Sequence, residues 1–248
     1  MGFKNSVAKL LGIQNSEGLV KRLRSKGIQI GNNVHFFGRI KDVSIDITRP
    51  SLVTIGDNVM IVSPFTITTH GYESFVFKNK FNEFLGSSGK VTIGDNVYFG
   101  KGVSITKNVN IGNNVIVGTN SVVTRSLPDD GVYAGVPCKK ISNLEDYFIK
   151  RKKEQLSEAK EYAISIKRRY NRLPVPEDFI EFFPLFLGRN DEEIKAFNLS
   201  LSRKLKRDKR APFTVLEQMG PAYDNFLKSE PNFKSFEDFL DYCELYKK

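Results

Sequence analysis

The repeat that organises this 248-residue chain is VTIGDNVYFGKGVSITKNVNIGNNVIVGTNSVVTRSLPDDGVYAGVPCKKI, residues 91–141. Apolar residues recur in it every six positions, in two columns that are offset by four residues. The first column is Ile93, Phe99, Ile105, Ile111, Val117 and Val123, and the second is Val97, Val103, Val109 and Val115. A period of six fits neither one helix, which has 3.6 residues per turn, nor one strand, which has a period of two. The stretch therefore predicts a coil of short strands joined by corners.

The residues between the two columns suit such corners, because they tolerate a positive φ that is closed to Val or Ile. They are Gly94, Gly100, Gly112 and Gly118 and the pairs Asp95-Asn96 and Asn113-Asn114. Three strands per turn close a triangle, and stacked triangles bury both columns while each strand pairs with the next turn at about 4.8 Å. A parallel β-helix without any activity is the structural alternative.

The repeat continues towards the N-terminus in a less regular form, through IGNNVHFFGRI (30–40) and IGDNVMIVSPFTITTHG (55–71). We expect the β-helix to span residues 28–141. Because Ile67 and Ile93 are not separated by a multiple of six, an excursion loop at 71–90 must interrupt it. Long loops in a regular scaffold often carry function. The aromatic residues of this loop are expected mostly to pack it onto the coil, with one or two left to face a bound molecule.

Helical periodicity flanks the coil on both sides. Residues 1–27 predict a short N-terminal helical cap, which would cover unpaired strand edges. Residues 142–248 predict an α-helical C-terminal region that begins with a helix of about 25 residues. Its last helix is expected to start at Ser235, with Asp238 three residues on as in a capping box. The expected fold is an all-β solenoid with helical ends.

The positive charge is concentrated in the repeats: residues 1–141 contain 17 Lys and Arg against 9 Asp and Glu, whereas residues 142–248 contain 21 against 19. A cationic surface attracts anionic ligands. The basic run at 203–210 fits a solvated loop, and one such cluster does not predict nucleic-acid binding. The basic run at 21–26 fits a solvated helix face, with peripheral membrane association as the alternative.

Cys138 and Cys243 are the only cysteines, and neither belongs to a CxxC metal pattern. They are too few for a disulfide framework, which fits a reducing compartment. No apolar run reaches the length of a membrane span, and the N-terminus lacks the pattern of a secretory leader. We therefore expect a cytoplasmic protein without a transmembrane segment.

Residues 91–141 resemble the hexapeptide-repeat acyltransferases, and within them the maltose and galactoside acetyltransferase branch. The motifs that carry the resemblance are IGDNVYFGKGVSI (93–105), IGNNVIVGTNSVVTRSLPDDG (111–131) and AGVPCKKI (134–141). The resemblance implies a left-handed β-helix and a homotrimer. It also implies acetyl-CoA, as the co-substrate, in a groove between neighbouring subunits, and a sugar or glycan acceptor.

His70 is the candidate catalytic residue, because it resembles in position the catalytic histidine of the sugar acetyltransferases. A hydroxyl that attacks a thioester must lose its proton, and an imidazole can accept that proton near neutral pH. A surface-loop histidine is the alternative, and we expect His35 to be structural. With two histidines in all, the chain cannot supply the three zinc-binding histidines of a carbonic anhydrase with this fold, so no metal is expected.

The resemblance also implies a set of residues around acetyl-CoA: Tyr98, Gly100, Thr119, Thr124, Arg125, Gly135, Pro137, Lys139 and Lys140. Lys139 takes the place of an arginine near the nucleotide phosphates, where a cation forms charge-assisted bonds. Tyr72, Phe75 and again Tyr98 are expected near the acceptor. The chain departs from the family at Ser142, where a second basic residue is usual, and at Pro64, where a sugar-binding asparagine is usual. We therefore expect a different acceptor.

These patterns and the resemblance together predict an acetyl-CoA-dependent O-acetyltransferase that acts on a sugar hydroxyl of a bacterial surface polysaccharide or of its precursor. The expected mechanism is direct transfer with His70 as general base. An N-acetyltransferase on an amino sugar is one alternative, because the same base serves an amine. A non-catalytic trimeric scaffold, whose helical region binds a partner, is the other.

Overall fold

The computed structural model describes residues 15–208 and 213–245, which form two compact units divided between residues 149 and 150. Helix α2 (Ser16–Ser25) opens the described part, and Asn15 accepts a hydrogen bond from the Gly18 amide at its N-terminus. Its buried face packs against the first strands of the coil, and Arg24 donates to the carbonyl oxygens of Ile30 and Gly31. The part of the predicted N-terminal helical cap that precedes residue 15 lies outside the described residues.

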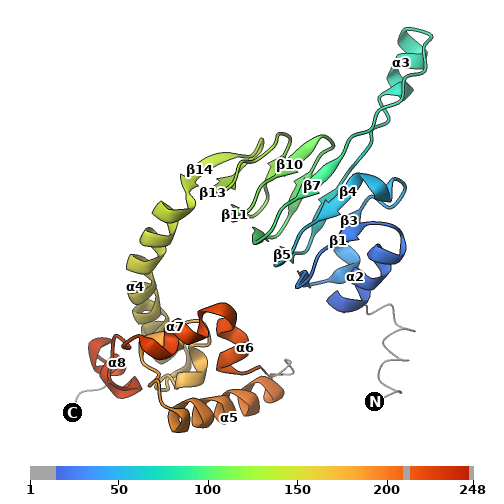
Figure 1. The fold of residues 1–248 in the computed structure, drawn as a ribbon. Helices are drawn as coiled ribbons and strands as arrows, with labels where there is room; N and C mark the ends of the chain where they lie inside the picture. Colours follow the sequence, from blue (N-terminus) through green and yellow to red (C-terminus); the bar gives the residue numbers. More distant parts are fainter. Residues whose placement is uncertain (1–14, 209–212, 246–248) are drawn as a thin grey trace. The chain divides into compact units, whose positions relative to one another are not determined.

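Three sheets of parallel strands form the first unit (Figure 1). The first sheet contains β1 (Gln29–Ile30), β4 (Val53–Ile55), β7 (Val91–Ile93) and β10 (Val109–Ile111). The second contains β2 (His35–Phe37), β5 (Val59–Val62), β8 (Val97–Phe99), β11 (Val115–Val117), β13 (Gly131–Ala134) and the antiparallel β14 (Lys139–Asn143). The third contains β3 (Val43–Ile45), β6 (Phe65–Ile67), β9 (Val103–Ile105) and β12 (Val122–Val123). The chain visits the three sheets in turn, which confirms the predicted coil and fits a left-handed β-helix.

Both predicted apolar columns are buried in this coil. Each regular strand carries one residue of each column at its two ends and turns only its middle residue outwards, as in Val97-Tyr98-Phe99. One regular turn takes 18 residues, since Val91 pairs with Val109. The preceding pair, Val53 with Val91, spans a longer stretch because the excursion lies within it.

The corners differ from the prediction in which residues adopt a positive φ. Asn96 and Asn114 have φ of 55° and 56°, whereas Gly94 and Gly112 do not have a positive φ. A Cβ on Gly94 would lie 2.9 Å from the Gly112 carbonyl carbon of the next turn. These glycines are therefore required by the close approach of stacked backbones, and the asparagines provide the left-handed corners.

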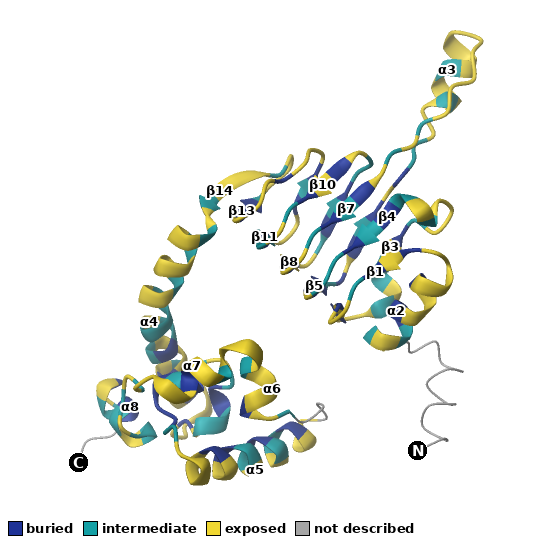
Figure 2. Cartoon of the chain, in the orientation of Figure 1, coloured by how far each residue is buried: buried dark blue, intermediate teal, exposed yellow. Residues whose placement is uncertain are grey.

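The excursion is an arm that leaves the coil after β6 and contains helix α3 (Ser74–Lys80), which Figure 1 shows away from the sheets. The expectation that its aromatic residues pack onto the coil is wrong for most of them. Tyr72, Phe75, Phe81 and Phe84 are all exposed, with Tyr72 at 78%. Figure 2 shows most of the arm around α3 in the colour of exposed residues. An apolar side chain can also be reserved for a partner molecule, and composition alone does not distinguish the two cases.

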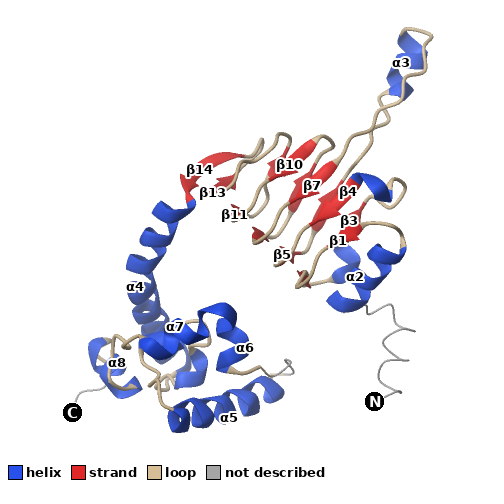
Figure 3. Cartoon of the chain, viewed as in Figure 1, coloured by secondary structure: helices blue, strands red, loops and turns tan. Residues whose placement is uncertain are grey.

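The second unit is helical (Figure 3). Its elements are α4 (Leu144–Tyr170), which begins in the first unit, η3 (Pro176–Asp178), η4 (Phe183–Leu185), α5 (Asp191–Arg207), α6 (Val215–Met219), η5 (Gly220–Ala222), α7 (Tyr223–Lys228) and α8 (Phe236–Tyr242). Phe179 lies in its core, in ring contact with Phe186 and Phe239. Ser235 caps α8 by accepting from the Asp238 amide, as the sequence predicted.

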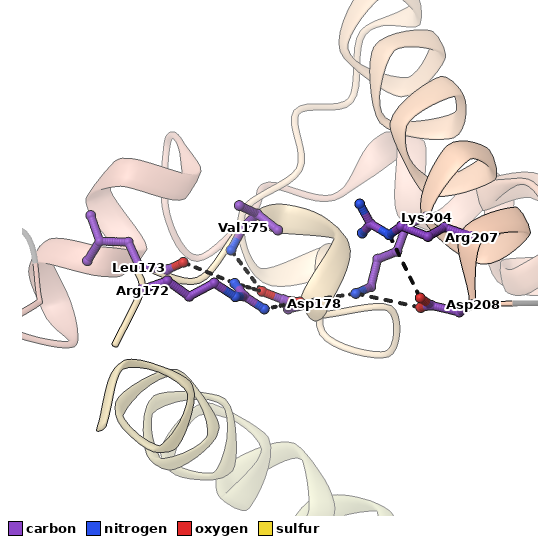
Figure 4. Close-up of polar contacts among 7 residues, drawn as sticks. All are labelled: Arg172, Leu173, Val175, Asp178, Lys204, Arg207 and Asp208. Atoms are coloured by element: carbon purple, nitrogen blue, oxygen red, sulfur yellow. Dashed lines mark hydrogen bonds and ion pairs between the residues drawn. The ribbon is translucent and has the colours of Figure 1, made fainter. Parts of the chain in front are cut away.

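A buried carboxylate links two elements of the second unit, η3 and α5 (Figure 4). Asp178, whose side chain is 4% exposed, accepts two bonds from the Arg172 guanidinium, one from the Val175 amide and one from Lys204 on α5. Burial opposes its charged form, but the bonds from Arg172, Val175 and Lys204 outweigh burial and lower the pKa of Asp178. The network ties η3 to α5.

Candidate functional site

His70 follows β6, at the corner where the chain leaves the third sheet and enters the arm. The parallel register of β3 and β6 aligns Ile45 with Ile67, so that Asp46 follows its strand at the same level as Thr68. The Asp46 carboxylate lies 2.5 Å from His70 Nδ1. Two residues that are 24 positions apart in sequence are thus joined by one turn of the coil.

The surroundings of Asp46 favour its charged form. Its Oδ1 accepts from the amide and hydroxyl of Thr48 at 2.9 and 2.7 Å, and its Oδ2 accepts from the Thr69 hydroxyl at 2.5 Å. The Asp46 side chain is only 7% exposed and that of His70 16%. Burial raises the pKa of Asp46, but the bonds from Thr48, Thr69 and His70 outweigh it and hold the pKa well below its usual range.

This arrangement fixes the imidazole tautomer. An ionised carboxylate can only accept hydrogen bonds, so His70 Nδ1 must carry the proton that it shares with Asp46. Nε2 then presents its lone pair and can act as a base. If His70 gains a second proton, Asp46 stabilises the resulting cation. The arrangement is therefore chemically equipped to take a proton from a hydroxyl.

The structure brings Tyr72 to His70 but carries Phe75 along the arm. The two rings of Tyr72 and His70 have centres 5.1 Å apart and meet edge to face at 76°. Phe75 lies on α3, where the Lys78 ammonium is 5.2 Å from the ring centre. Tyr98 lies in the middle of β8, 40% exposed, between Met60 and Ile116 of the neighbouring strands.

Apart from Tyr98, the residues predicted to hold acetyl-CoA lie in three places. Gly100 and Thr119 stack at the corner between the second and third sheets, where a Cβ on Gly100 would lie 2.7 Å from the Thr119 amide nitrogen. Thr124 and Arg125 follow β12 at the corner that also carries His70. Paired strands separate them from His70 by two turns, or about 10 Å along the coil.

The turn between β13 and β14 contains the remaining residues of this set. Gly135 has φ of +102°, its carbonyl accepts from the Val122 amide, and Pro137 follows a cis peptide bond. Lys139 and Lys140 begin β14 and are exposed. In the part of the chain that the structure describes, Arg125, Lys139 and Lys140 form no ion pair. These cations are therefore available to an anionic ligand.

Two residues of this region escaped the sequence prediction. Asp46 was missed because the early turns are irregular, with η1 (Ile40–Asp42) and η2 (Pro50–Leu52) before β3 and β4. Aligning Ile45 with Ile67 as one column would have brought Asp46 to the His70 corner. Lys107 was missed as well, and its ammonium contacts both Glu73 and Ser87 of the arm.

His35, the second histidine, lies on β2, where its Nε2 is 2.6 Å from the Asn33 side-chain oxygen. Within residues 15–208 and 213–245, no group of three or more His, Cys, Asp or Glu side chains could hold a metal ion. The same residues contain no helix that is both long and apolar enough to cross a membrane.

Residues 90–125 match the bacterial transferase hexapeptide family (six repeats). The chain is 34% identical over 177 residues to Protein CapG of Staphylococcus aureus, which covers 68% of this chain and 99% of CapG. It is 36% identical over 118 residues to the galactoside O-acetyltransferase of Escherichia coli (strain K12), covering 47% of this chain and 57% of that enzyme. A solved maltose O-acetyltransferase from Clostridium difficile 630 aligns with a TM-score of 0.38 and 29% identity, over 52% of this chain and 75% of that one.

The match to CapG spans nearly the whole of that relative, and the hexapeptide match falls on the regular turns of the coil. As the repeat and its motifs predicted, the chain belongs to the bacterial hexapeptide-repeat transferase family.

Proposed function

We propose that this protein is an acetyl-CoA-dependent O-acetyltransferase that acts on a sugar hydroxyl of a bacterial surface polysaccharide or of its precursor. The observation that carries the proposal is the pair Asp46 and His70, which leaves Nε2 of a largely buried imidazole free to accept a proton. The names of the galactoside and maltose relatives support a sugar as acceptor.

The proposed reaction is a direct transfer. His70 Nε2 takes the proton of the sugar hydroxyl as its oxygen attacks the thioester carbonyl, and Asp46 stabilises the imidazolium that forms. Backbone amides of the coil stabilise the oxyanion. The carbon–sulfur bond then breaks, and the coenzyme A thiolate leaves and receives the proton. No acyl-enzyme is needed.

The residues present fit coenzyme A as a substrate. Its phosphates would meet the unpaired cations Arg125, Lys139 and Lys140, and charge-assisted bonds to phosphate are strong. Gly100 and Gly135 carry no side chain at the corner between the second and third sheets, so an extended chain could approach the backbone at these two positions.

The placement of Tyr98 favours a trimer. In a triangular coil, the corner that carries His70 lies opposite the second sheet, which contains Tyr98. One chain therefore cannot offer both residues to one substrate, whereas two neighbouring chains can. The outward middle residues Met60, Tyr98 and Ile116 also form an apolar column on this sheet, while Thr54, Thr92 and Asn110 occupy the equivalent positions on the first. An apolar column suits contact with a second copy.

The test is thiol release from acetyl-CoA in the presence of a panel of methyl glycosides. We expect His70→Ala to lower kcat by about 10² to 10⁴, which is the usual contribution of a general base. His35→Ala is the comparison variant, because it removes the other imidazole, and its kcat should fall far less than that of His70→Ala. Equal rates for His70→Ala and wild type would discard His70 as the base.

Two further measurements address the alternatives. An ester product is cleaved by mild alkali and an amide is not, so mass spectrometry before and after alkali separates O-acetylation from N-acetylation. Equilibrium dialysis with millimolar acetyl-CoA tests the non-catalytic scaffold, which predicts no binding.

A further inference from the structure

The neck of the arm, where its two legs join the coil, is held together beside His70. His70 forms an antiparallel bridge with Ser88, the Gly71 amide donates to the Ser87 carbonyl at 3.3 Å, and the Gly89 amide donates to the Thr69 carbonyl at 2.8 Å. The backbone of the proposed base is thus part of a two-stranded neck, and any movement of the arm acts directly on it.

Lys107 links both legs of the neck to the next turn of the coil. It follows β9, and its Nζ lies 2.7 Å from Glu73 Oε1 on the outgoing leg while also contacting Ser87 Oγ on the returning leg. Ser87 donates to Glu73 at 3.2 Å, which closes a triangle of three side chains. The bond from Lys107 is also the main reason why the pKa of Glu73 is lowered.

Tyr72 lies between the two attachment points of the outgoing leg. On one side is the bridge of His70, and on the other is the ion pair of Glu73. The Glu73 carboxylate also folds back over Gly71, where any Cβ would collide with it. These contacts fix the backbone on both sides of Tyr72, so that its exposed ring remains at the edge of the imidazole.

We propose that Lys107 is a positioning residue: together with Glu73 and Ser87 it holds Tyr72 beside His70, where the ring forms one wall of the acceptor subsite. The inference rests on the proposed function, because the acceptor is bound for acetyl transfer. We call these three side chains, Lys107, Glu73 and Ser87, the clamp. The inference assigns the clamp to recognition of the acceptor and not of acetyl-CoA, since Lys107 is already engaged by the arm. An aromatic wall beside the base suits a sugar, whose apolar C–H face packs against a ring.

Steady-state kinetics of Lys107→Met provide the first test, with the methyl glycoside that wild type acetylates best. We expect the acceptor KM to rise about two- to fivefold, the range for a partly exposed ion pair, with kcat and the acetyl-CoA KM unchanged. Lys107→Arg should behave as wild type, and Lys107→Glu combined with Glu73→Lys should recover most of the loss. Lys90→Met, which removes an exposed charge at the base of the arm, is the matched control and should have no effect.

A double-mutant cycle tests whether the effect passes through Tyr72. If the clamp acts by placing this ring, Lys107→Met should add nothing to the acceptor KM of Tyr72→Ala. An unchanged acceptor KM in Lys107→Met, an equal rise in the acetyl-CoA KM, or fully additive effects with Tyr72→Ala would overturn the proposal.

Amide hydrogen exchange separates this proposal from the proposed function. Lys107→Met should speed exchange at Gly71 and Gly89, whose amides bond across the neck, and should leave the coil strands unchanged. Unchanged exchange there overturns the clamp whether or not the protein transfers acetyl groups. Absence of thiol release by wild type with every glycoside contradicts the proposed function instead.

Discussion

Asp46→Asn is the sharpest perturbation of the candidate site, because it keeps the shape of the side chain and changes only one oxygen. Both carboxylate oxygens accept bonds, so the new NH₂ group must face donors wherever it points. Next to Thr48 it would oppose a backbone amide at 2.9 Å, which cannot become an acceptor. Next to His70 it would oppose the Thr69 hydroxyl, which can rotate, and an imidazole, which can change its tautomer. The Thr69 backbone amide also faces this oxygen, but its bond is longer, at 3.3 Å. We therefore expect the amide nitrogen to point at His70.

The consequence is a misplaced proton on His70. With Nδ1 now accepting from the amide, Nε2 carries the hydrogen and has no lone pair for the acceptor hydroxyl. Loss of general-base action predicts a fall in kcat of about 10² to 10⁴. The KM for acetyl-CoA should change little, because Asp46 is buried beneath His70.

Stability adds a second signature with a definite sign. The folded-state pKa of Asp46 lies below its unfolded value, so its charged network stabilises wild type above about pH 4, and that contribution is lost as pH falls through the lower folded-state pKa. The asparagine variant lacks this contribution at every pH. The gap in free energy of unfolding between wild type and variant should therefore narrow on acidification below pH of about 4.

Thiol release gives kcat, and denaturant unfolding across a pH series gives the stability gap. Asp42→Asn is the control, because Asp42 lies in the same segment and forms only a solvent-accessible pair with Arg39 at 3.5 Å. A kcat within twofold of wild type for Asp46→Asn would refute the role of Asp46 in setting the tautomer.

Two further predictions concern the second unit and the proposed trimer. Asp178→Ala removes the acceptor shared by Arg172 and Lys204 and should destabilise the protein by about 2–3 kcal/mol in denaturant unfolding at neutral pH, with kcat for thiol release unchanged. Met60→Asp should convert a trimer into monomers in light scattering, because it loses about 1.5–3 kcal/mol of apolar burial per interface, whereas Thr92→Asp on the first sheet should not. A trimeric Met60→Asp would contradict the second sheet as the interface.

The coil could be predicted from the sequence because its period directly records which side chains point inwards. Ile93 and Val97 belong to columns whose members are all buried, and no tertiary information was needed to find them. The sequence did not show why glycine is needed at the corners. A glycine at position 94 could serve either a positive φ or the close approach of another backbone. Only the structure, in which the Gly112 backbone of the next turn lies against Gly94, shows that the close approach is the reason.

The candidate site was predictable in part. His70 could be proposed because it resembles in position the catalytic histidine of the sugar acetyltransferases. Its partner Asp46, 24 residues away, required the register of two irregular turns. Lys107 could not be found, because its role depends on the direction in which the arm folds back. The exposure of Tyr72 and Phe84 was likewise undetermined, since an apolar residue in a loop satisfies the sequence pattern whether it packs inwards or faces a partner.

The corner after the third sheet explains why the proposed base His70, the clamp residue Lys107 and the free cation Arg125 occur together. Successive turns place Thr68, Thr106 and Thr124 one above another there, and Lys107 and Arg125 follow the last two of them. Lys107 is the cation nearest in the stack to the His70 turn, and Glu73 neutralises it at 2.7 Å. When His70 gains a proton, its positive charge is therefore stabilised by the Asp46 carboxylate. The paired Lys107 in the next turn does little to repel that charge. Arg125, one turn further on, keeps its charge available for an anionic donor, so base and cation can act from the same corner without weakening each other.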